Sequence, residues 1–133
     1  MMKARIRKAQ RLLELQRGLQ RLEEGKIAGL KSRQAELATL QEDLISALNT
    51  DDGPQGLLVV AIVRRLRSLG EETALLAEEL ERRYATLRTH TARAKYAERR
   101  SRTCEEQHAK AQAQKELLEV IERALRSENA SLP

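Results

Sequence analysis

The chain has 133 residues, of which 34% are charged and only 2% are aromatic, and its formal net charge is +5. It contains no Phe and no Trp, so the bulky residues that usually fill a globular core are missing. A single cysteine, Cys104, excludes an internal disulfide. The longest apolar run, Leu57–Val63, is far shorter than the roughly 20 residues that a membrane-spanning helix needs, and no signal segment follows the basic start. We therefore expect a cytoplasmic protein built from long helices.

A first helix is predicted over about residues 3–48. Leucines spaced three and four residues apart indicate that one stripe of this helix faces a partner helix. The leucines before Gly25 and the apolar residues after it differ by one position, so we expect a skip in the stripe beside Gly25 and Gly29. The expected stripe is Leu12, Leu15, Leu19, Leu22 and then Ile27, Leu30, Gln34, Leu37, Gln41, Leu44 and Leu48.

Residues 49–56 are predicted to form the turn of the hairpin. Asn49 can adopt a left-handed conformation after a helix, Gly53 tolerates positive φ, and Pro54 cannot continue a helix. A short polar connection between two amphipathic helices is typical of an antiparallel pair. We expect residue i to lie opposite roughly residue 105 − i.

The second helix is predicted over about residues 57–126, followed by a short tail over 127–133. One apolar stripe continues through the helix without a skip, and it is longer than the first helix can cover. We therefore expect the second helix to extend beyond the first from around Cys104 onward. The expected stripe is Val59, Ile62, Leu66, Leu69, Thr73, Leu76, Leu80, Arg83, Leu87, His90, Ala94, Ala97, Ser101, Cys104, His108, Ala111, Lys115, Leu118, Glu122 and Leu125.

No pattern of catalytic residues is present, and we expect neither an enzyme nor a cofactor. Cys104 and His108 are spaced to share a helix face and could bind zinc, but no second pair of ligands lies nearby in the sequence. Packing in the stripe is the simpler interpretation. The small residues between Ala94 and Ala111 indicate either packing against larger leucines or a weakly held segment.

Two groups of apolar residues exceed what a two-helix stripe can bury, and both are candidate docking surfaces. The first, near the turn, comprises Leu40, Ile45, Leu58, Val60 and Val63, and a broader local core is the alternative. The second lies on the extension of the second helix, where a frayed tail is the alternative. Its members are Leu117, Leu118, Val120, Ile121 and Leu125.

Two basic runs, residues 1–11 and 82–102, are expected to lie near each other in the hairpin. They include Arg5, Arg7, Arg99 and Arg100. Such runs can form a solvated helix face, or they can bind an acidic protein, nucleic acid or anionic lipid. No motif that reads nucleic-acid bases is present.

The basic start, the paired helices with a longer second helix and the turn sequence Leu48-Asn49-Thr50-Asp51 resemble the FliJ/YscO family of type III secretion and flagellar export. The resemblance implies a stalk that inserts its open end into a hexameric export ATPase, contacts the cytoplasmic domain of the export gate near its turn, and binds secretion chaperones. It implies a peripheral location at the inner membrane and no small-molecule substrate.

By position relative to the turn, the resemblance places the gate contact on the first helix at Leu37, Leu40 and Leu44. On the second helix it implies Leu66 and Leu69, beside the surplus apolar Leu58 and Val63. The ATPase contact would use Arg5, Arg7, Arg99, Arg100, Leu117, Leu118, Ile121 and Leu125. The alternatives are a self-associating coiled-coil scaffold, in which the extensions pair with each other, and a basic coiled coil that binds nucleic acid.

Overall fold

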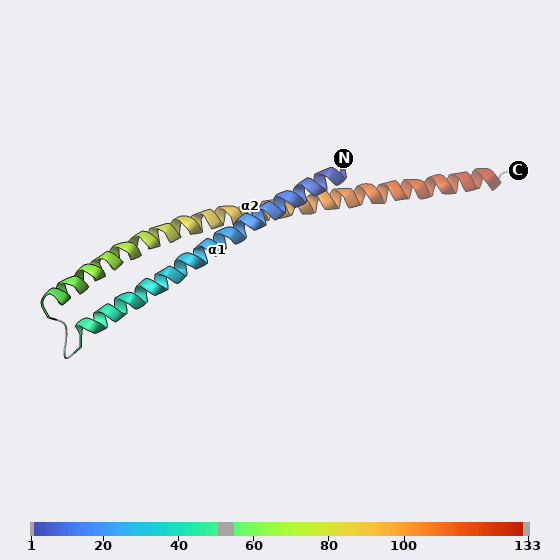
Figure 1. Ribbon diagram of the computed structural model, residues 1–133. Helices are drawn as coiled ribbons and strands as arrows, with labels where there is room; N and C mark the ends of the chain where they lie inside the picture. Colours follow the sequence, from blue (N-terminus) through green and yellow to red (C-terminus); the bar gives the residue numbers. More distant parts are fainter. Residues whose placement is uncertain (1, 51–54, 132–133) are drawn as a thin grey trace. The chain divides into compact units, whose positions relative to one another are not determined.

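The computed structural model describes residues 2–50 and 55–131, and it contains two α-helices (Figure 1). Helix α1 spans Met2–Leu48 and helix α2 spans Leu57–Ser131. The expected all-α, two-helix antiparallel hairpin with a longer second helix is confirmed. Helix α2 ends at Ser131, five residues beyond the predicted end at residue 126. The predicted turn residues Asp51, Asp52, Gly53 and Pro54 lie outside the described residues.

The described ends of the turn show how each helix stops and starts. The amide of Asn49 donates to the carbonyls of Ile45 and Ser46 at 3.2 Å, and the Thr50 hydroxyl donates to the Ala47 carbonyl at 3.1 Å. Asn49 does not have a positive φ, so it does not adopt the left-handed conformation that the sequence allows. Gly56 does, with φ of 61°, and its carbonyl accepts the amide of Val60 at the start of α2.

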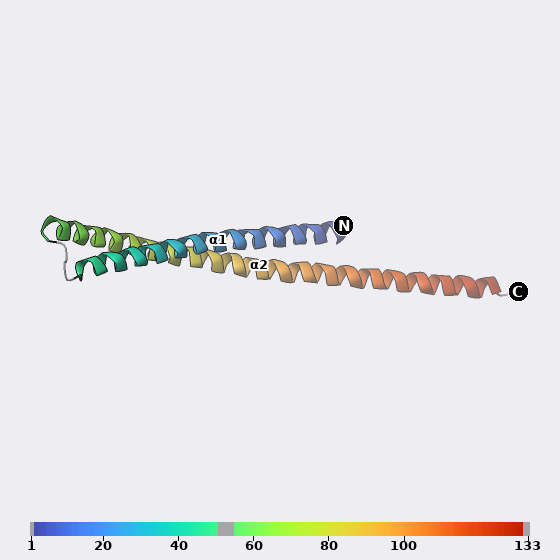
Figure 2. The same cartoon turned by 60° about the horizontal axis from the view of Figure 1, so that its bottom comes forward.

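The contacts divide the chain into two units, each made of one segment from each helix. We call Gly18–Thr91 the turn unit, and Met1–Arg17 with Ala92–Pro133 the terminal unit. Within the terminal unit, the N-terminal part of α1 lies beside the orange part of α2 in both views (Figures 1 and 2). None of the described helices is long and apolar enough to span a membrane.

The turn unit contains the hydrophobic core. Leu37 and Leu69 are fully buried and pack with Leu76, and the half-buried Leu30 and Leu44 complete the cluster. Because unfolding would expose these large aliphatic side chains to water, their burial stabilises the pair. Contacts across the turn unit join residue pairs whose numbers sum to between 105 and 115, so the observed register lies slightly beyond the expected sum of about 105.

Ion pairs also join the two helices of the turn unit. The Arg33 guanidinium donates to Glu72 at 2.8 Å, and Arg83 donates to Glu23 at 3.3 Å. Hydrogen bonds from Arg33 to Glu72 and then to Glu36 raise the pKa of Arg33 above its ordinary value. Lys31 also lies over the ring of Tyr84, 5.5 Å from its centroid.

The buried stripe of α1 differs from the predicted one before Ile27. Gln16, Gln20 and Glu23 face α2 with varying degrees of burial, whereas Leu12, Leu15 and Leu22 are exposed. The predicted skip is therefore wrong, because the stripe before Ile27 lies one residue later than the leucines and is in phase with the stripe after it. Of the other predicted members, Leu19 is half-buried and Gln34 is exposed. Helix α1 passes through Gly25 and Gly29 without a break, and a Cβ added at either glycine would meet nothing within 4 Å. The observed stripe is Ile6, Ala9, Leu13, Gln16, Gln20, Glu23, Ile27, Leu30, Leu37, Gln41, Leu44 and Leu48.

The stripe predicted for α2 is confirmed from Val59 to Ala111, since all of its members in that range are buried or half-buried. In the terminal unit these members are small. Ala94, Ala97 and Ser101 are buried against α1, where Ala9 is the buried residue. No cluster of large buried side chains like that of the turn unit occurs among the described residues of the terminal unit. The two helix segments are therefore held together with little apolar volume between them.

The extension of α2 begins later than predicted. In the terminal unit Gln10 donates to Glu105 at 3.3 Å, ten residues further along α2 than the expected neighbour Lys95. Met2 and Lys3 lie against His108 and Lys115, so α1 covers α2 as far as Lys115. We define the overhang as residues 116–131, which α1 does not reach.

Candidate protein-docking surfaces

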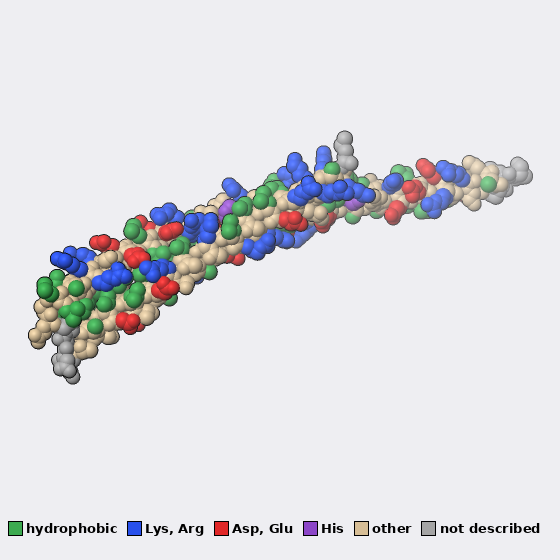
Figure 3. All heavy atoms as spheres, in the orientation of Figure 1, with side chains coloured by type: hydrophobic (Ala, Val, Ile, Leu, Met, Phe, Trp, Pro, Cys, Tyr) green, Lys and Arg blue, Asp and Glu red, His purple; other side chains and the backbone are tan. Residues whose placement is uncertain are grey.

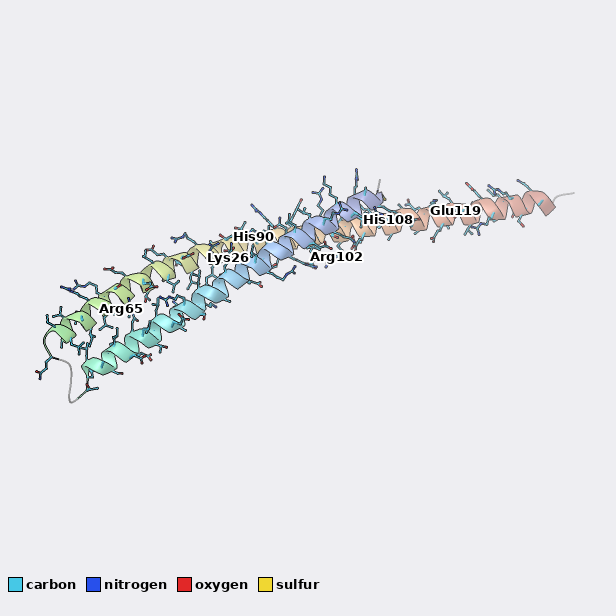
Figure 4. The ribbon with its side chains drawn as sticks, viewed as in Figure 1. Lys26, Arg65, His90, Arg102, His108 and Glu119 are labelled. Atoms are coloured by element: carbon cyan, nitrogen blue, oxygen red, sulfur yellow. The ribbon has the colours of Figure 1, made fainter. Side chains whose placement is uncertain are left out.

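The overhang is a helix without a partner. Every residue from Glu116 to Ala130 is exposed, including five large aliphatic side chains whose exposed fractions lie between 46% and 60%. Figure 4 labels His108 beside the start of α1 and Glu119 further along α2. An isolated helix of this length is marginally stable in water, so an exposed apolar face on it indicates a surface that another molecule covers. These five residues are Leu117, Leu118, Val120, Ile121 and Leu125.

Charged side chains of the overhang pair with each other rather than with α1. Arg123 lies 4.0 Å from Glu119, and Arg126 lies 3.9 Å from Glu122. Both pairs have the i, i+4 spacing that brings side chains together on one helix. The overhang is therefore amphipathic, with an apolar face and a face whose opposite charges partly neutralise each other.

A basic groove lies between the two helix segments of the terminal unit. Its volume is about 920 Å³, and it is lined by four cations and no carboxylate. Figure 3 shows Lys and Arg side chains gathered on the surface where the N-terminal part of α1 lies along α2. Ala9 and Cys104 are the small buried or half-buried residues of the groove, and Tyr96 is 63% exposed within it. The cations are Arg5 and Lys8 from α1 and Arg99 and Arg100 from α2.

None of these four cations forms an ion pair with another described residue. In the turn unit, by contrast, Arg33 and Arg83 each bind a carboxylate across the helix pair. Like charges that converge without counter-charges repel each other, and an anionic ligand relieves that repulsion. The groove is therefore a candidate site for a partner that carries carboxylates or other anions.

A second apolar surface lies at the turn end of the turn unit. Leu40, Ile45, Leu58, Val60 and Val63 are exposed there, as the sequence predicts for a docking surface, and Leu57 is exposed as well. Leu37 and Leu69 are instead fully buried in the core. Neither of these two leucines can contact a partner in this conformation, because each is already covered by the opposite helix.

The remaining partner-binding residues that the resemblance implies differ in how accessible they are. Leu44 packs against the core and Leu66 is half-buried, so each offers only part of its side chain to a partner. Arg7 is exposed but does not line the basic groove, whereas Arg5, Arg99 and Arg100 do. Lys8, Leu12 and Tyr96 line the groove without having been predicted, because the sequence alone does not show which face of each helix borders it.

The buried polar groups of the described residues lie along the helix pair. Glu23 is 4% exposed and binds Arg83, while Gln16 Oε1 and His90 Nδ1 are buried without a hydrogen-bond partner. No group of three or more His, Cys, Asp or Glu side chains that could hold a metal ion occurs over residues 2–50 and 55–131.

Comparison with protein-family models, with curated proteins and with solved structures found no match for this chain. What the protein does must therefore be inferred from the surfaces of its two units.

Proposed function

We propose that this protein is a non-enzymatic stalk of the FliJ/YscO type, which links a hexameric export ATPase to the cytoplasmic domain of an export gate at the inner membrane. The observation that carries the proposal is the overhang, because a helix with an exposed apolar face suits insertion into a ring or groove of another protein. The unequal lengths of α1 and α2, 47 and 75 residues, are the other feature that supports it.

In this proposal the terminal unit binds the ATPase. Leu117, Leu118 and Ile121 supply apolar contact area, and the unpaired Arg5, Arg99 and Arg100 attract acidic residues of the ring. Opposite charges would speed the encounter and orient the two proteins, whereas the apolar contacts would supply most of the affinity.

The turn unit would bind the export gate through Leu40, Leu58 and Val63, which are the predicted contact residues that remain exposed. Secretion chaperones are further partners that the proposal includes. The partners are proteins throughout, and no small-molecule substrate is involved.

The test uses the purified chain and the export ATPase of the same organism. We expect the full chain to bind the ATPase hexamer and to stimulate ATP hydrolysis, and Leu118→Asp to weaken both because it places a charge in the apolar contact. Arg126→Asp is the matched control, since it introduces the same residue on the opposite face of the overhang. A full chain that neither binds nor stimulates the ATPase would refute the stalk function.

A further inference from the structure

The basic groove of the terminal unit differs from the rest of the helix pair in two ways. Its fully buried residues, Ala9, Ala94, Ala97 and Ser101, are all small, and its larger apolar side chains are only half-buried or exposed. In addition, four cations line it and no carboxylate does. A third helix that carries large aliphatic residues between carboxylates would complement both features, by filling the groove and neutralising its walls.

The overhang has this composition. At 100° per residue, its apolar side chains from Leu117 to Leu125 cover an arc of about 160°, wide enough to contact two helices at once. The first charged residue at each edge of that arc is a glutamate. Glu122 lies next to Leu118, and Glu116 lies next to Val120, at the i, i+4 spacing.

The overhang also has the right length. It comprises residues 116–131, and the segment of α1 that forms one side of the terminal unit comprises residues 2–17. Both segments are therefore about 24 Å long. An overhang cannot fold back onto its own groove, since α2 continues through it as one unbroken helix.

We propose that two copies of this chain form an antiparallel dimer in which the overhang of each copy lies in the basic groove of the other. A two-fold axis near Ala111 of α2 generates this arrangement. It brings Ile121 of one copy to the level of Ser101 in the other, Leu118 to the level of Cys104, and Glu122 to the level of Arg100. Each overhang then completes a three-helix bundle with α1 and α2 of its partner copy.

This dimer is independent of the proposed stalk function, because it concerns what the terminal unit binds when no other protein is present. It buries the same apolar face that an ATPase would need. Self-association and ATPase binding are therefore mutually exclusive at the overhang, and either can fail without the other.

Sedimentation velocity of the full chain at increasing concentration tests the dimer. We expect Arg100→Glu and Glu122→Arg to raise the dimer dissociation constant about tenfold each, because each change converts two symmetric ion pairs into like-charge contacts. The double variant should regain most of the lost affinity. Glu119→Arg is the matched control, since residue 119 lies on the face away from the groove, and it should leave the dissociation constant unchanged.

Cross-linking tests the register directly. In the variant Leu118→Cys, oxidised with diamide, the introduced thiol of one copy should form a disulfide with the native Cys104 of the other, with diamide taking up the two thiol hydrogens. Cys104→Ser in the same background should abolish the link. The two introduced thiols of the proposed dimer are about 20 Å apart along the axis and should not link to each other.

Three results would overturn the proposal. The first is a chain that stays monomeric at all concentrations. The second is a double charge variant that dimerises no better than either single variant. The third is a disulfide between the two introduced thiols of Leu118→Cys, which would show that the overhangs pair with each other instead.

Discussion

The carboxylate of Glu23 lies 3.3 Å from the guanidinium of Arg83, and it is buried while the neighbouring Leu22 is exposed. A carboxylate that is taken out of water needs a counter-charge, and Arg83 supplies it across the helix pair while also lying 3.9 Å from Glu79. This ion pair holds α1 in the rotation that exposes Leu22.

Removing one member of this pair should destabilise the chain more than removing both. We expect Glu23→Ala to lower the free energy of unfolding by about 1–3 kcal/mol, because it leaves Arg83 without its partner on α1 and with only the more distant Glu79. The double variant Glu23→Leu with Arg83→Leu should be at least as stable as the wild type. Urea unfolding followed by circular dichroism measures both, and Glu24→Ala, at an exposed neighbour, should change the stability by less than about 0.5 kcal/mol.

The exposed leucines of α1 provide a test of its register. Leu22→Gln should change the free energy of unfolding by less than about 0.5 kcal/mol, because Leu22 is 57% exposed. Ile27→Gln should cost about 2–4 kcal/mol, since it buries an amide against α2. If the two substitutions had equal effects in the same denaturant experiment, the register described here would be incorrect.

The core of the turn unit should dominate the stability of the chain. Leu37→Ala removes a fully buried side chain and should lower the free energy of unfolding by about 2–5 kcal/mol. Leu75→Ala, at a position that is 65% exposed, is the matched control and should have an effect below about 0.5 kcal/mol. Thermal unfolding of the two variants beside the wild type gives the comparison.

Amide hydrogen exchange should separate the overhang from the rest of α2. At a concentration at which the chain is monomeric, amides of residues 116–131 should exchange at least about tenfold faster than those near Leu69 and Leu76, because no tertiary contact protects them. Protection of the overhang should then increase with concentration if the proposed dimer forms. Equal exchange rates along α2 in the monomer would contradict the description of the overhang as an unpartnered helix.

The fold and the α2 register could be predicted because α2 offers a single stripe with the correct spacing. The register of α1 could not, because two stripes with the same spacing lie one residue apart, and the leucine stripe is the more apolar of the two. The choice depends on residues of α2 that lie far away in the sequence, above all Arg83, which binds Glu23. Intrinsic hydrophobicity therefore favoured the wrong face of α1.

The candidate surfaces could likewise be predicted only in part. The apolar face of the overhang follows from the lengths of the two helices, and the sequence predicts it. The lining of the basic groove depends on how both helices are rotated, which the sequence does not show, so Lys8 and Tyr96 line it without being predicted and Arg7 does not line it. The resemblance implies partner contacts at Leu37 and Leu69, but position relative to the turn gives no sign that the opposite helix of the chain already covers both.

Gly25 and Gly29 make α1 easier to bend, although no neighbouring atom requires a glycine at either position. Both lie inside a continuous helix, and an added methyl group would meet no neighbouring atom at either position. Alanine in their place would favour the helix by about 1 kcal/mol each. The middle of α1 can therefore absorb bending strain at low energetic cost, while the buried residues on either side of it keep the two helices in register.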